Sequence, residues 1–543
     1  MVKFHAVFLT LFLVCLATVV PAQRAPLLDF DLVVYGGTAG GVITAVTAAR
    51  EGLHVALLEP RQHLGGMVSG GLGWTDYGKK EVIGGTSLEF FERVGAKYGE
   101  PLAWHFEPHV AEGVFQEMVK TAGVEVFYRH RLREKNGVVK AGNRIVEIAI
   151  ETGARFRAAF FADASYEGDL MAQAGVSYVY GREGVQQYGE SLAGVRDRTP
   201  FHQFLVRRDP NNAASVVPVQ VSPYDTNHKL LPGIFAGPKG PAGQADKKVQ
   251  AYNFRLCLTD DPANRVPITR PANYRPAQYE LLARFLTQAT IAAGRPLTLV
   301  DVMKPDALGR NHKTDVNNNG AVSTDDIGAS WEYPDADYRT RDRIWQAHAD
   351  YVAGFLYFLV SDPRVPPGLQ AEMNRWGLAR DEFVDTNHWP HQLYVREARR
   401  MVGEYVMTQK DIQTDLTKPD PIGMGSYNSD SHNIQRIVNA DGFVENEGDM
   451  QVAVTPYQIP YRVMLPRRAQ ATNLLVPVAF SASHVAYSTL RMEPQYMIIG
   501  QAAGLAAAMA MHTQVGVQDI DTAALTARLR SQRAVMDWKN GGS

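Results

Sequence analysis

The chain has 543 residues, of which 45% are hydrophobic and 21% charged, and its formal net charge at pH 7 is -2. A chain of this length can bury a large core, and the composition is that of a globular protein. The small net charge gives no electrostatic reason to expect nucleic acid as a partner.

The first 22 residues have the layout of a secretory signal peptide. Lys3 is a positive start, the run from Ala6 to Val20 is almost wholly apolar, and Val20-Pro21-Ala22 supplies small residues for cleavage. The apolar run is short for a membrane span, although an uncleaved anchor is the alternative. We therefore expect a signal peptide over 1–22, a periplasmic or secreted protein, and no stable membrane span. Cleavage would leave Cys257 as the only cysteine, which excludes an internal disulfide.

A dinucleotide-binding pattern opens the mature chain. The apolar run Asp31 to Tyr35 predicts a central parallel strand, and it is followed by a glycine turn, a helical run and a second apolar run that ends at Glu59. Glycines let the backbone approach a pyrophosphate at a helix N-terminus, and the acidic residue accepts hydrogen bonds from ribose hydroxyls. The turn residues predicted to hold the cofactor are Gly36, Gly37, Thr38, Ala39 and Gly40.

The turn departs from the usual spacing at one place. The pattern expects glycine two residues before Gly37, and this chain has Tyr35 there. Either the turn tolerates tyrosine or Gly36 takes over part of the task. A glycine turn in an unrelated α/β fold is the alternative reading of the whole segment.

Three further segments indicate FAD in place of NAD. After Glu59 the chain carries five glycines between 65 and 73, a composition that suits backbone lying against a flat ring and a diphosphate. This loop resembles that of the glutathione-reductase-type FAD fold. A strand that ends at Asp163 keeps part of the Asp-Ala-Thr-Gly-like turn of such proteins. The cofactor contacts predicted from these segments are Pro60, Arg61, Gly65, Gly66, Met67 and Asp163.

The C-terminal region predicts a second cofactor segment. An apolar strand at 471–478 precedes a helix at 497–511 that is rich in small residues. Its N-terminal N–H groups and dipole would face the flavin and stabilise the reduced, anionic form. Gly500 and Ala503 are the predicted contacts, with simple helix packing as the alternative.

The chain resembles the large bacterial FAD-dependent oxidoreductase family. The resemblance is carried by the opening and by runs such as 251–255, 262–267, 317–320, 392–401 and 456–462. It implies FAD, redox chemistry and an α/β fold: a Rossmann-like FAD-binding domain with an inserted α+β substrate domain. The expected division is 1–22 signal peptide, 29–198 and 462–515 FAD-binding domain, 199–461 substrate domain, and 516–543 C-terminal tail.

Catalysis by such an enzyme needs a base for the substrate proton. Histidine suits this role because its pKa lies near neutral pH, and His484 is the first choice because it lies between the apolar strand and the helix at 497–511. His391, with its neighbour His388, is the second. Arg491 is predicted to bind an anionic substrate or the flavin pyrimidine oxygen. A satisfied core histidine is the alternative for His484.

Two other patterns are set aside. Arg396, Arg399 and Arg400 are interpreted as part of a helix with a solvated or salt-bridged face. The spacing from Asp315 to Asp326 fits a calcium loop, but no good helix precedes it. We read it as a loop near substrate and predict no metal site, with calcium binding as the open alternative.

The leading hypothesis is an exported FAD-dependent dehydrogenase or oxidase of a hydroxylated small molecule, such as a carbohydrate derivative, with an unknown electron acceptor. The rivals are an NAD(P)H-dependent flavin reductase or monooxygenase, a non-redox flavin-dependent lyase or isomerase, and a flavin-binding protein without catalysis. Only one dinucleotide motif is evident, which counts against a dedicated nicotinamide domain.

Overall fold

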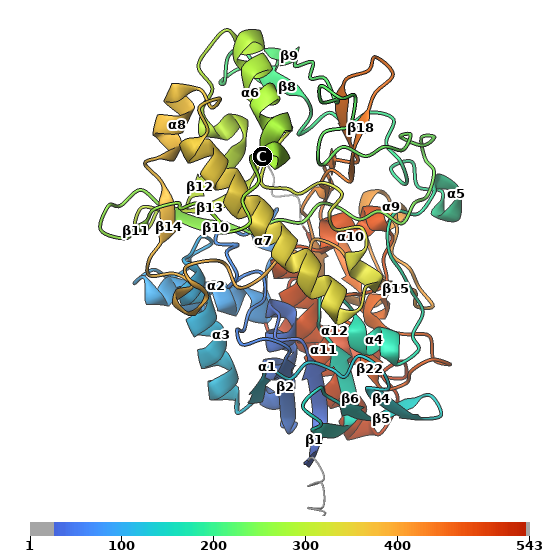
Figure 1. Ribbon diagram of the computed structural model, residues 1–543. Coiled ribbons are helices and arrows are strands. Elements are labelled where there is room, and N and C mark those ends of the chain that lie inside the picture. The colour runs from blue at the N-terminus through green and yellow to red at the C-terminus, as the bar shows by residue number, and fades with distance from the viewer. Residues whose placement is uncertain (1–25, 539–543) are drawn as a thin grey trace, which may run out of the picture.

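The computed structural model describes residues 26–538. The signal peptide expected over 1–22 lies outside this range, and so does the end of the C-terminal tail expected over 516–543. The described chain is a mixed α/β structure with a largely parallel sheet low in Figure 1 and an antiparallel sheet above it. The long helix α7 (Tyr338–Ser361) runs diagonally across the molecule.

The lower sheet has the strand order β3-β2-β1-β6-β5-β4, and β22 pairs with the end of β6. Strands β1, β2, β3, β6 and β22 are parallel, whereas β4 and β5 form an antiparallel meander with β6. Leu32, Val33 and Val34 are fully buried, as the continuous apolar run predicts for a strand covered on both faces. The strands are β1 Leu27–Tyr35, β2 Val55–Glu59, β3 Glu125–Tyr128, β4 Val138–Ala141, β5 Arg144–Ala149, β6 Arg155–Asp163 and β22 Leu474–Leu475.

Two buried helices cross closely beside this sheet: α1 (Ala39–Arg50) and α11 (Glu493–Thr513). Their glycines make the close approach possible, since a Cβ on Gly500 would lie 2.3 Å from the carbonyl oxygen of Gly40. The predicted C-terminal helix is therefore confirmed and extends beyond the expected range. Helices α2 (Gly85–Lys97) and α3 (Pro108–Ala122) pack next to them.

The upper sheet has the order β11-β14-β10-β13-β12 and is antiparallel throughout. All its strands fall between residues 199 and 461, the segment predicted as a substrate domain. Its strands are β10 Leu256–Thr259, β11 Arg265–Val266, β12 Met303–Ala307, β13 Lys313–Asn318 and β14 Gly377–Ala379, and α6 (Glu280–Ala293) and α8 (Pro367–Met373) lie in the same segment.

The helix predicted around Arg396, Arg399 and Arg400 is wrong. The segment is irregular, with only Arg400–Met401 in a short strand, β15. Its arginines are not solvated either: Arg396 is 1% exposed and Arg400 is 0% exposed. They are buried because carboxylates distant in the sequence pair with them, Asp325 with Arg396 and Glu183 with Arg400.

The calcium loop is not formed. Asp315 lies within β13, and its two carboxylate oxygens accept hydrogen bonds from Arg255 and from the Trp74 amide. A buried ion pair therefore occupies the position that the calcium spacing assigned to a metal ligand.

The remaining elements are short. They are α4 Asp169–Gln173, α5 Val185–Tyr188, α9 Gln409–Gln413, α10 His484–Leu490, α12 Thr522–Ser531, β7 Tyr178–Val179, β8 Leu205–Arg207, β9 Val216–Pro218, β16 Pro421–Gly425, β17 Ser429–Ser431, β18 Gln435–Val438, β19 Val444–Glu447, β20 Met450–Val452 and β21 Tyr457–Pro460, with short 3₁₀ turns such as η4 Tyr333–Asp335.

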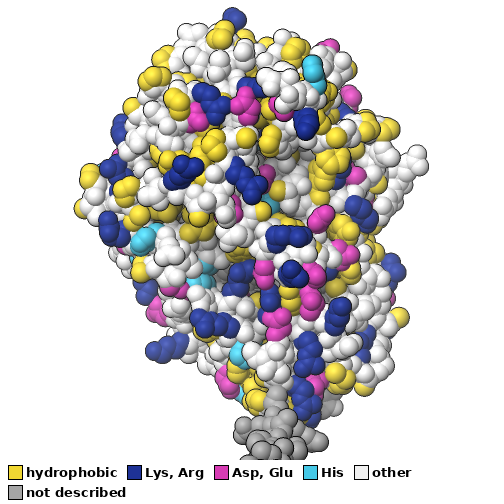
Figure 2. Space-filling model, viewed as in Figure 1, with side chains coloured by type: hydrophobic (Ala, Val, Ile, Leu, Met, Phe, Trp, Pro, Cys, Tyr) yellow, Lys and Arg dark blue, Asp and Glu magenta, His cyan; other side chains and the backbone are white. Residues whose placement is uncertain are grey.

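Within 26–538, no helix has both the length and the apolar character that crossing a membrane requires. Acidic and basic side chains are intermixed on the face shown in Figure 2, in keeping with the net charge of -2.

Candidate active site

A cavity of about 270 Å³ lies where the carboxyl ends of β1, β2 and β6 meet the first turns of α7. The carboxyl edge of a parallel sheet is where dinucleotide ligands bind in α/β folds. Six predicted cofactor residues line the cavity: Gly36, Thr38, Glu59, Pro60, Arg61 and Gly66. The other lining residues are Tyr35, His63, Arg131, Ser165, Tyr166, Glu167, Asp169, Tyr333, Tyr338, Arg341, Asp342, Trp345 and Gln392.

The glycine turn brings backbone to the cavity wall. Gly36 has a φ of +103°, and a Cβ there would lie 2.6 Å from the Ser165 amide nitrogen, so only glycine fits. Thr38 then caps α1 by accepting a hydrogen bond from the Gly41 amide through Oγ1 at 3.1 Å. Tyr35 is accommodated because its hydroxyl accepts a hydrogen bond from the Leu132 amide at 3.2 Å. Tyr35, which stands where the usual spacing has glycine, is therefore the last residue of β1. Gly36 is the residue that adopts the positive φ that the turn requires.

Glu59 binds the turn that it faces. Its carboxylate accepts hydrogen bonds from the Gly37 amide at 2.8 Å and from the Arg61 amide at 2.6 Å. Burial raises the pKa of Glu59 to about 7, although these two amides act to lower it. A carboxylate oxygen has more than one lone pair, so both oxygens keep capacity for a ligand hydroxyl at the cavity surface.

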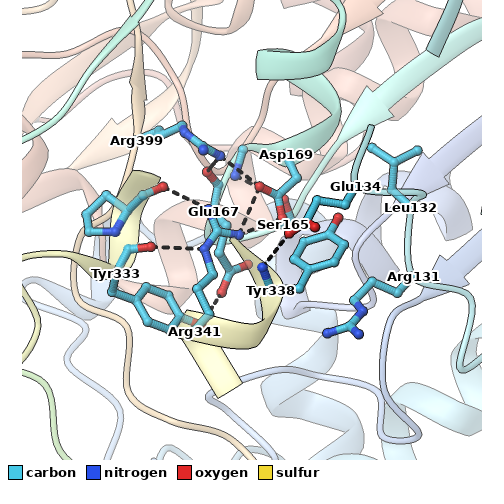
Figure 3. Close-up of polar contacts among 12 residues, drawn as sticks. Arg131, Leu132, Glu134, Ser165, Glu167, Asp169, Tyr333, Tyr338, Arg341 and Arg399 are labelled. Atoms are coloured by element: carbon cyan, nitrogen blue, oxygen red, sulfur yellow. Dashed lines mark hydrogen bonds and ion pairs between the residues drawn. The ribbon is translucent and has the colours of Figure 1, made fainter. Parts of the chain in front are cut away.

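The opposite wall comes from α7 and its neighbours (Figure 3). Arg341 donates to both carboxylate oxygens of Asp169, at 2.8 and 2.9 Å, and to the Tyr333 carbonyl at 2.9 Å. Arg399 also binds Asp169, at 2.7 Å. Nearer the adenosine end, the Arg61 guanidinium lies 3.7 Å from the ring centre of Trp345. These contacts hold α7 against the sheet and give the cavity a rigid polar wall.

Tyr166 marks the inner end of the cavity. Its hydroxyl accepts from the Met67 amide at 2.9 Å and donates to Glu493 Oε1 at 2.8 Å. Glu493 is the first residue of α11, and its other oxygen, Oε2, is buried without a hydrogen-bond partner among the described residues. Burial raises the pKa of Glu493 to about 8, so the acid is protonated at neutral pH and its free oxygen can donate a hydrogen bond.

Beyond Tyr166 lies a group of largely buried charged residues, which we call the polar cluster: Asp325, Arg396, Asp430, His432 and Arg491. Asp325 binds Arg396 at 3.0 Å and His432 Nδ1 at 2.8 Å. Arg491 binds the Asp430 carboxylate at 3.0 Å. Arg491 stands two residues before the start of α11, and Arg396 follows Gln392 of the cavity wall by four residues. None of the five residues lines the cavity; Arg491 connects the cluster to it through Glu493, which accepts a hydrogen bond from Tyr166 of the cavity wall.

The charges of the cluster are held in their ionised forms by each other. Burial alone would raise the pKa of Asp325, but Arg396 and His432 more than offset this and keep it below its usual value. Burial is likewise offset at Asp430, whose pKa is lowered by His432 and Arg491. Two ionised carboxylates thus face a histidine and two arginines in a largely buried site.

Several polar atoms of the cluster are left without partners. Nε of Arg396 and Nε of Arg491 are buried and make no hydrogen bond to any described residue, whereas Nη2 of Arg396 and Oδ1 of Asp325 are partners only in their ion pair at 3.0 Å. The Arg396–Asp325 pair is close enough to attract but is misaligned for a hydrogen bond. Each unpaired buried group costs about 1–3 kcal/mol, so a run of them indicates a polar ligand that pairs them.

His484 lies at the start of α10 with both ring nitrogens bonded. Nδ1 pairs with Glu397 at 2.8 Å and Nε2 with the Ser431 hydroxyl at 3.1 Å. Burial, followed by the charge of Arg400, lowers the pKa of His484 to about 3. No ring nitrogen is free for a substrate proton in this geometry. The role of His484 as a base stays a prediction, and the geometry counts against it.

His391 lies beside the glycine loop, with its ring stacked on His63 at 3.9 Å between centroids and Nε2 3.4 Å from the Ser69 hydroxyl. Burial, followed by the charge of His63, lowers its pKa to about 3. The third predicted catalytic residue, Arg491, belongs to the polar cluster. The structure places His391 apart from the other two, because His484 and Arg491 both contact β17, through Ser431 and Asp430 respectively.

The other predicted cofactor residues support the cavity from behind. Gly65 donates its amide to the Gly37 carbonyl at 2.7 Å, and Asp163 accepts from the Ser165 and Met171 amides. Gly37, Ala39, Gly40 and Met67 are buried in the turn, at the start of α1 and in the loop. Gly500 and Ala503 are buried in α11, where Gly500 abuts α1, and neither lines the cavity.

Sequence reasoning missed most of the polar cluster. Asp430 and His432 stand in the polar run Asn428 to Asn433, which has the composition of a surface loop. Asp325 stands in the segment interpreted as a loop near substrate, and Arg396 was assigned to a solvated helix face. The one available signal was the density of polar residues in this run, and it carries no information on pairing.

The site fits the cofactor that the sequence predicts. Gly36 lines the cavity in a turn that only glycine can form, Glu59 has acceptor capacity at the cavity surface, and Glu493 offers a buried oxygen, at the N-terminus of α11, that has no partner among the described residues. These are the features that a pyrophosphate, a ribose and a flavin edge require.

Comparison with protein families matches residues 31–529 to the family described as FAD dependent oxidoreductase. No curated protein matches the chain. Similar solved structures include the OxyS anhydrotetracycline hydroxylase from Streptomyces rimosus, with 13% identity, 35% of this chain and 44% of that chain covered, and a TM-score of 0.24. Another is THI4 from Thermovibrio ammonificans, with 18% identity, 28% and 67% covered, and a TM-score of 0.22.

A third similar structure is the 3-ketosteroid-delta4-(5alpha)-dehydrogenase from Rhodococcus jostii RHA1, with 14% identity, 31% and 59% covered, and a TM-score of 0.22. The chain spans roughly half to two thirds of the length of these three structures. The family match extends over most of the chain, and it makes this protein an enzyme with FAD as its cofactor. The chain belongs to the family of FAD-dependent oxidoreductases.

Proposed function

We propose that this protein is an exported dehydrogenase or oxidase that oxidises a hydroxylated small molecule, such as a carbohydrate derivative. The observation that carries the proposal is the polar cluster. It combines ionised carboxylates, arginine donors and a histidine beside the inner end of the cofactor cavity. A substrate with several hydroxyl groups can both donate to the carboxylates and accept from the arginines.

The cofactor-binding residues follow from the cavity. Gly36 and Thr38 present backbone to the diphosphate, Glu59 accepts from the ribose, and Pro60, Arg61 and Gly66 line the rest. The architecture we propose is the glutathione-reductase type, with 199–461 as an inserted substrate domain. When bound, FAD accepts a hydride from a carbon of the substrate. The chain's own residues orient the substrate, exclude water and take up its proton.

Anaerobic mixing with a panel of sugars, sugar acids and simple polyols tests the proposal. We expect at least one compound of this class to bleach the oxidised flavin band, with a ketone, aldehyde or acid as the product. Bleaching by NADPH alone would instead favour the reductase or monooxygenase reading. A flavin that no hydroxylated compound reduces would refute the proposed reaction.

Export is tested separately from catalysis. Expression of the full chain in a bacterial host, followed by fractionation and N-terminal sequencing, should yield a periplasmic or secreted protein that begins near Gln23. A protein that keeps Met1 and stays with the cytoplasm would refute export and leave the reaction untouched. Reoxidation of the reduced enzyme by dioxygen or by a quinone then distinguishes an oxidase from a dehydrogenase.

A further inference from the structure

His432 pairs one ring nitrogen with a buried carboxylate and leaves the other without a hydrogen bond to a described residue. Its Nδ1 is bound to Asp325 Oδ2 at 2.8 Å, and the ring is 7% exposed. Its other nitrogen, Nε2, makes no hydrogen bond to any described residue; the Asp430 carboxylate lies 3.6 Å away, which is beyond hydrogen-bond distance. His484, in contrast, uses both nitrogens.

Asp325 orients the ring and selects its tautomer. Arg396 lies on the far side of this carboxylate, at 3.0 Å, and helps to keep it ionised in a buried site. Because Asp325 binds Nδ1, Nε2 is the ring nitrogen that makes no hydrogen bond to a described residue. A carboxylate, a histidine and a free ring nitrogen in this order form the arrangement by which enzymes prepare a general base.

The position of His432 also suits that role. Asp430, two residues earlier in the same segment, binds Arg491, and Arg491 leads directly into α11. The Ser429–Ser431 strand, β17, packs against α10. His432 is thereby fixed to the same helix N-terminus that Tyr166 connects to the cofactor cavity.

We propose that His432, positioned by Asp325, is the base that removes the hydroxyl proton of the substrate; the proposal rests on the proposed function. In the step, the O–H bond breaks and the proton goes to His432 Nε2. The electron pair of the broken O–H bond forms the second C–O bond. The C–H bond of the same carbon breaks, and its two electrons leave with the hydrogen for the flavin. The alcohol becomes a carbonyl, and the imidazolium that forms is stabilised by Asp325 and Asp430.

The unpaired N–H donors of the polar cluster could bind the substrate beside His432. Nε of Arg491 and Nε of Arg396 are buried and unpaired, so they can hold oxygens of the substrate while His432 takes the proton. His202 lies parallel to His432 at 6.3 Å but has no carboxylate at hydrogen-bond distance; Asp449 is 4.0 Å away. His202 therefore lacks the orienting partner that His432 has.

The test compares His432→Gln, Asp325→Asn and a control, His348→Gln. His348 is a fully buried histidine on α7 that binds the Ile344 carbonyl and lies outside the cluster. FAD content and melting temperature are measured first, and reduction by dithionite checks that the flavin of each variant is intact. The rate of anaerobic flavin reduction is then followed against substrate concentration.

We expect His432→Gln to bind FAD and to lower the limiting reduction rate by roughly 10²–10⁴-fold. Dithionite reduction should be unchanged, and the substrate concentration that gives half the limiting rate should change by less than about 3-fold. His348→Gln should be reduced at the parent rate. Asp325→Asn should lower the limiting rate by about 10-fold or more, because an amide no longer enforces the Nδ1–H tautomer.

A second measurement does not depend on turnover. In ¹⁵N-histidine-labelled protein, the signals that disappear in His432→Gln belong to His432, and their shifts should report a proton on Nδ1 that is lost or moved in Asp325→Asn. A proton on Nε2 in the parent would overturn the assignment.

The failures can be told apart. If a substrate reduces the parent and reduces folded, FAD-loaded His432→Gln at the same rate, the base assignment falls and the proposed function stands. If no hydroxylated compound reduces the parent, both fall. If His432→Gln does not fold, Asp325→Asn and the tautomer measurement on the parent decide.

Discussion

The two ends of the site are built in different ways. At the nucleotide end, the turn after β1, the start of α1 and Glu59 come from one stretch of 29 residues, Asp31 to Glu59. At the chemical end, Asp325, Arg396, His432 and Arg491 come from four distant segments. The nucleotide end uses backbone groups that any sequence able to form the turn would supply, whereas the chemical end depends on which side chains tertiary packing brings together.

The two ends of the site also differ in the groups that stabilise their charged side chains. Glu59 is satisfied by two main-chain amides, and its environment raises its pKa to about 7. In the polar cluster, each charge depends on another side chain, and some polar atoms make no hydrogen bond within the described part of the chain. A substitution at the nucleotide end should therefore change cofactor affinity, and one at the chemical end should change the rate.

The largest effect is expected from the glycine turn. Gly36→Val places side-chain atoms against the backbone of Ala164 and Ser165 and forces a branched residue to a φ of +103°. The cost is about 4 kcal/mol or more, and the protein should lose FAD or fail to fold. Gly52→Val is the control, since Gly52 has a φ of +94° with no atom within 4 Å of the added Cβ.

FAD released on denaturation and melting temperature provide the measurement. The control should lose some stability and keep its cofactor. A Gly36→Val protein that is yellow and as stable as the control would mean that the turn does not contact the nucleotide.

Glu493, at the boundary between the two ends, should give a pH-dependent effect. Its folded pKa is about 8 and its ordinary value is 4.5, so the folded state keeps a proton that the unfolded state releases between these pH values. Folding stability from this group is therefore complete below pH 4.5 and is lost as the pH rises to about 8. Glu493→Gln removes this loss, which is on the order of 4 kcal/mol.

The melting temperatures of parent and Glu493→Gln should therefore diverge from pH 5 to pH 8, with the variant becoming the more stable. Glu117→Gln is the control: its exposed carboxylate pairs with Lys97, which lowers its pKa, so this variant should show no such gain. A constant difference between Glu493→Gln and the parent across this range would show that Glu493 is ionised in the folded protein.

Glu59 tests the nucleotide end through a side chain that also accepts hydrogen bonds from the Gly37 and Arg61 amides. Glu59→Ala should weaken FAD binding by about 1–3 kcal/mol, or roughly 5- to 150-fold, because ribose hydroxyls lose their acceptor. Titration of the apoprotein with FAD, followed by flavin fluorescence, measures the affinity. Glu125→Ala, an exposed residue on β3, is the control. Unchanged affinity in Glu59→Ala would remove Glu59 from the ribose site.

His484 gives the smallest expected effect and the sharpest contrast with His432. Because both its nitrogens serve buried partners, His484→Gln should lower stability by about 1–3 kcal/mol and leave the reduction rate per bound FAD within a few-fold of the parent. Stopped-flow reduction and a melting curve measure the two properties. A stable, FAD-loaded variant whose reduction is slowed 10²-fold or more would restore the sequence-based assignment and count against His432.

The amino-acid sequence by itself determined the nucleotide end: β1, the glycine turn, α1 and β2 in order, with Glu59 at the cavity, and the buried α11. These features are local, because a strand, a turn with positive φ and a helix start depend on neighbouring residues and on their period. The FAD family followed from the same residues.

Only the tertiary structure decided the chemical end. The sequence placed Arg396 and Arg400 on a solvated or salt-bridged helix face, and only the fold brings Asp325 and Glu183 to pair with them. His432 and its orienting carboxylate lie 107 residues apart, and no local pattern records such a pairing. The physical reason is that a charge can be buried only beside a partner, and the fold as a whole decides which partner reaches it.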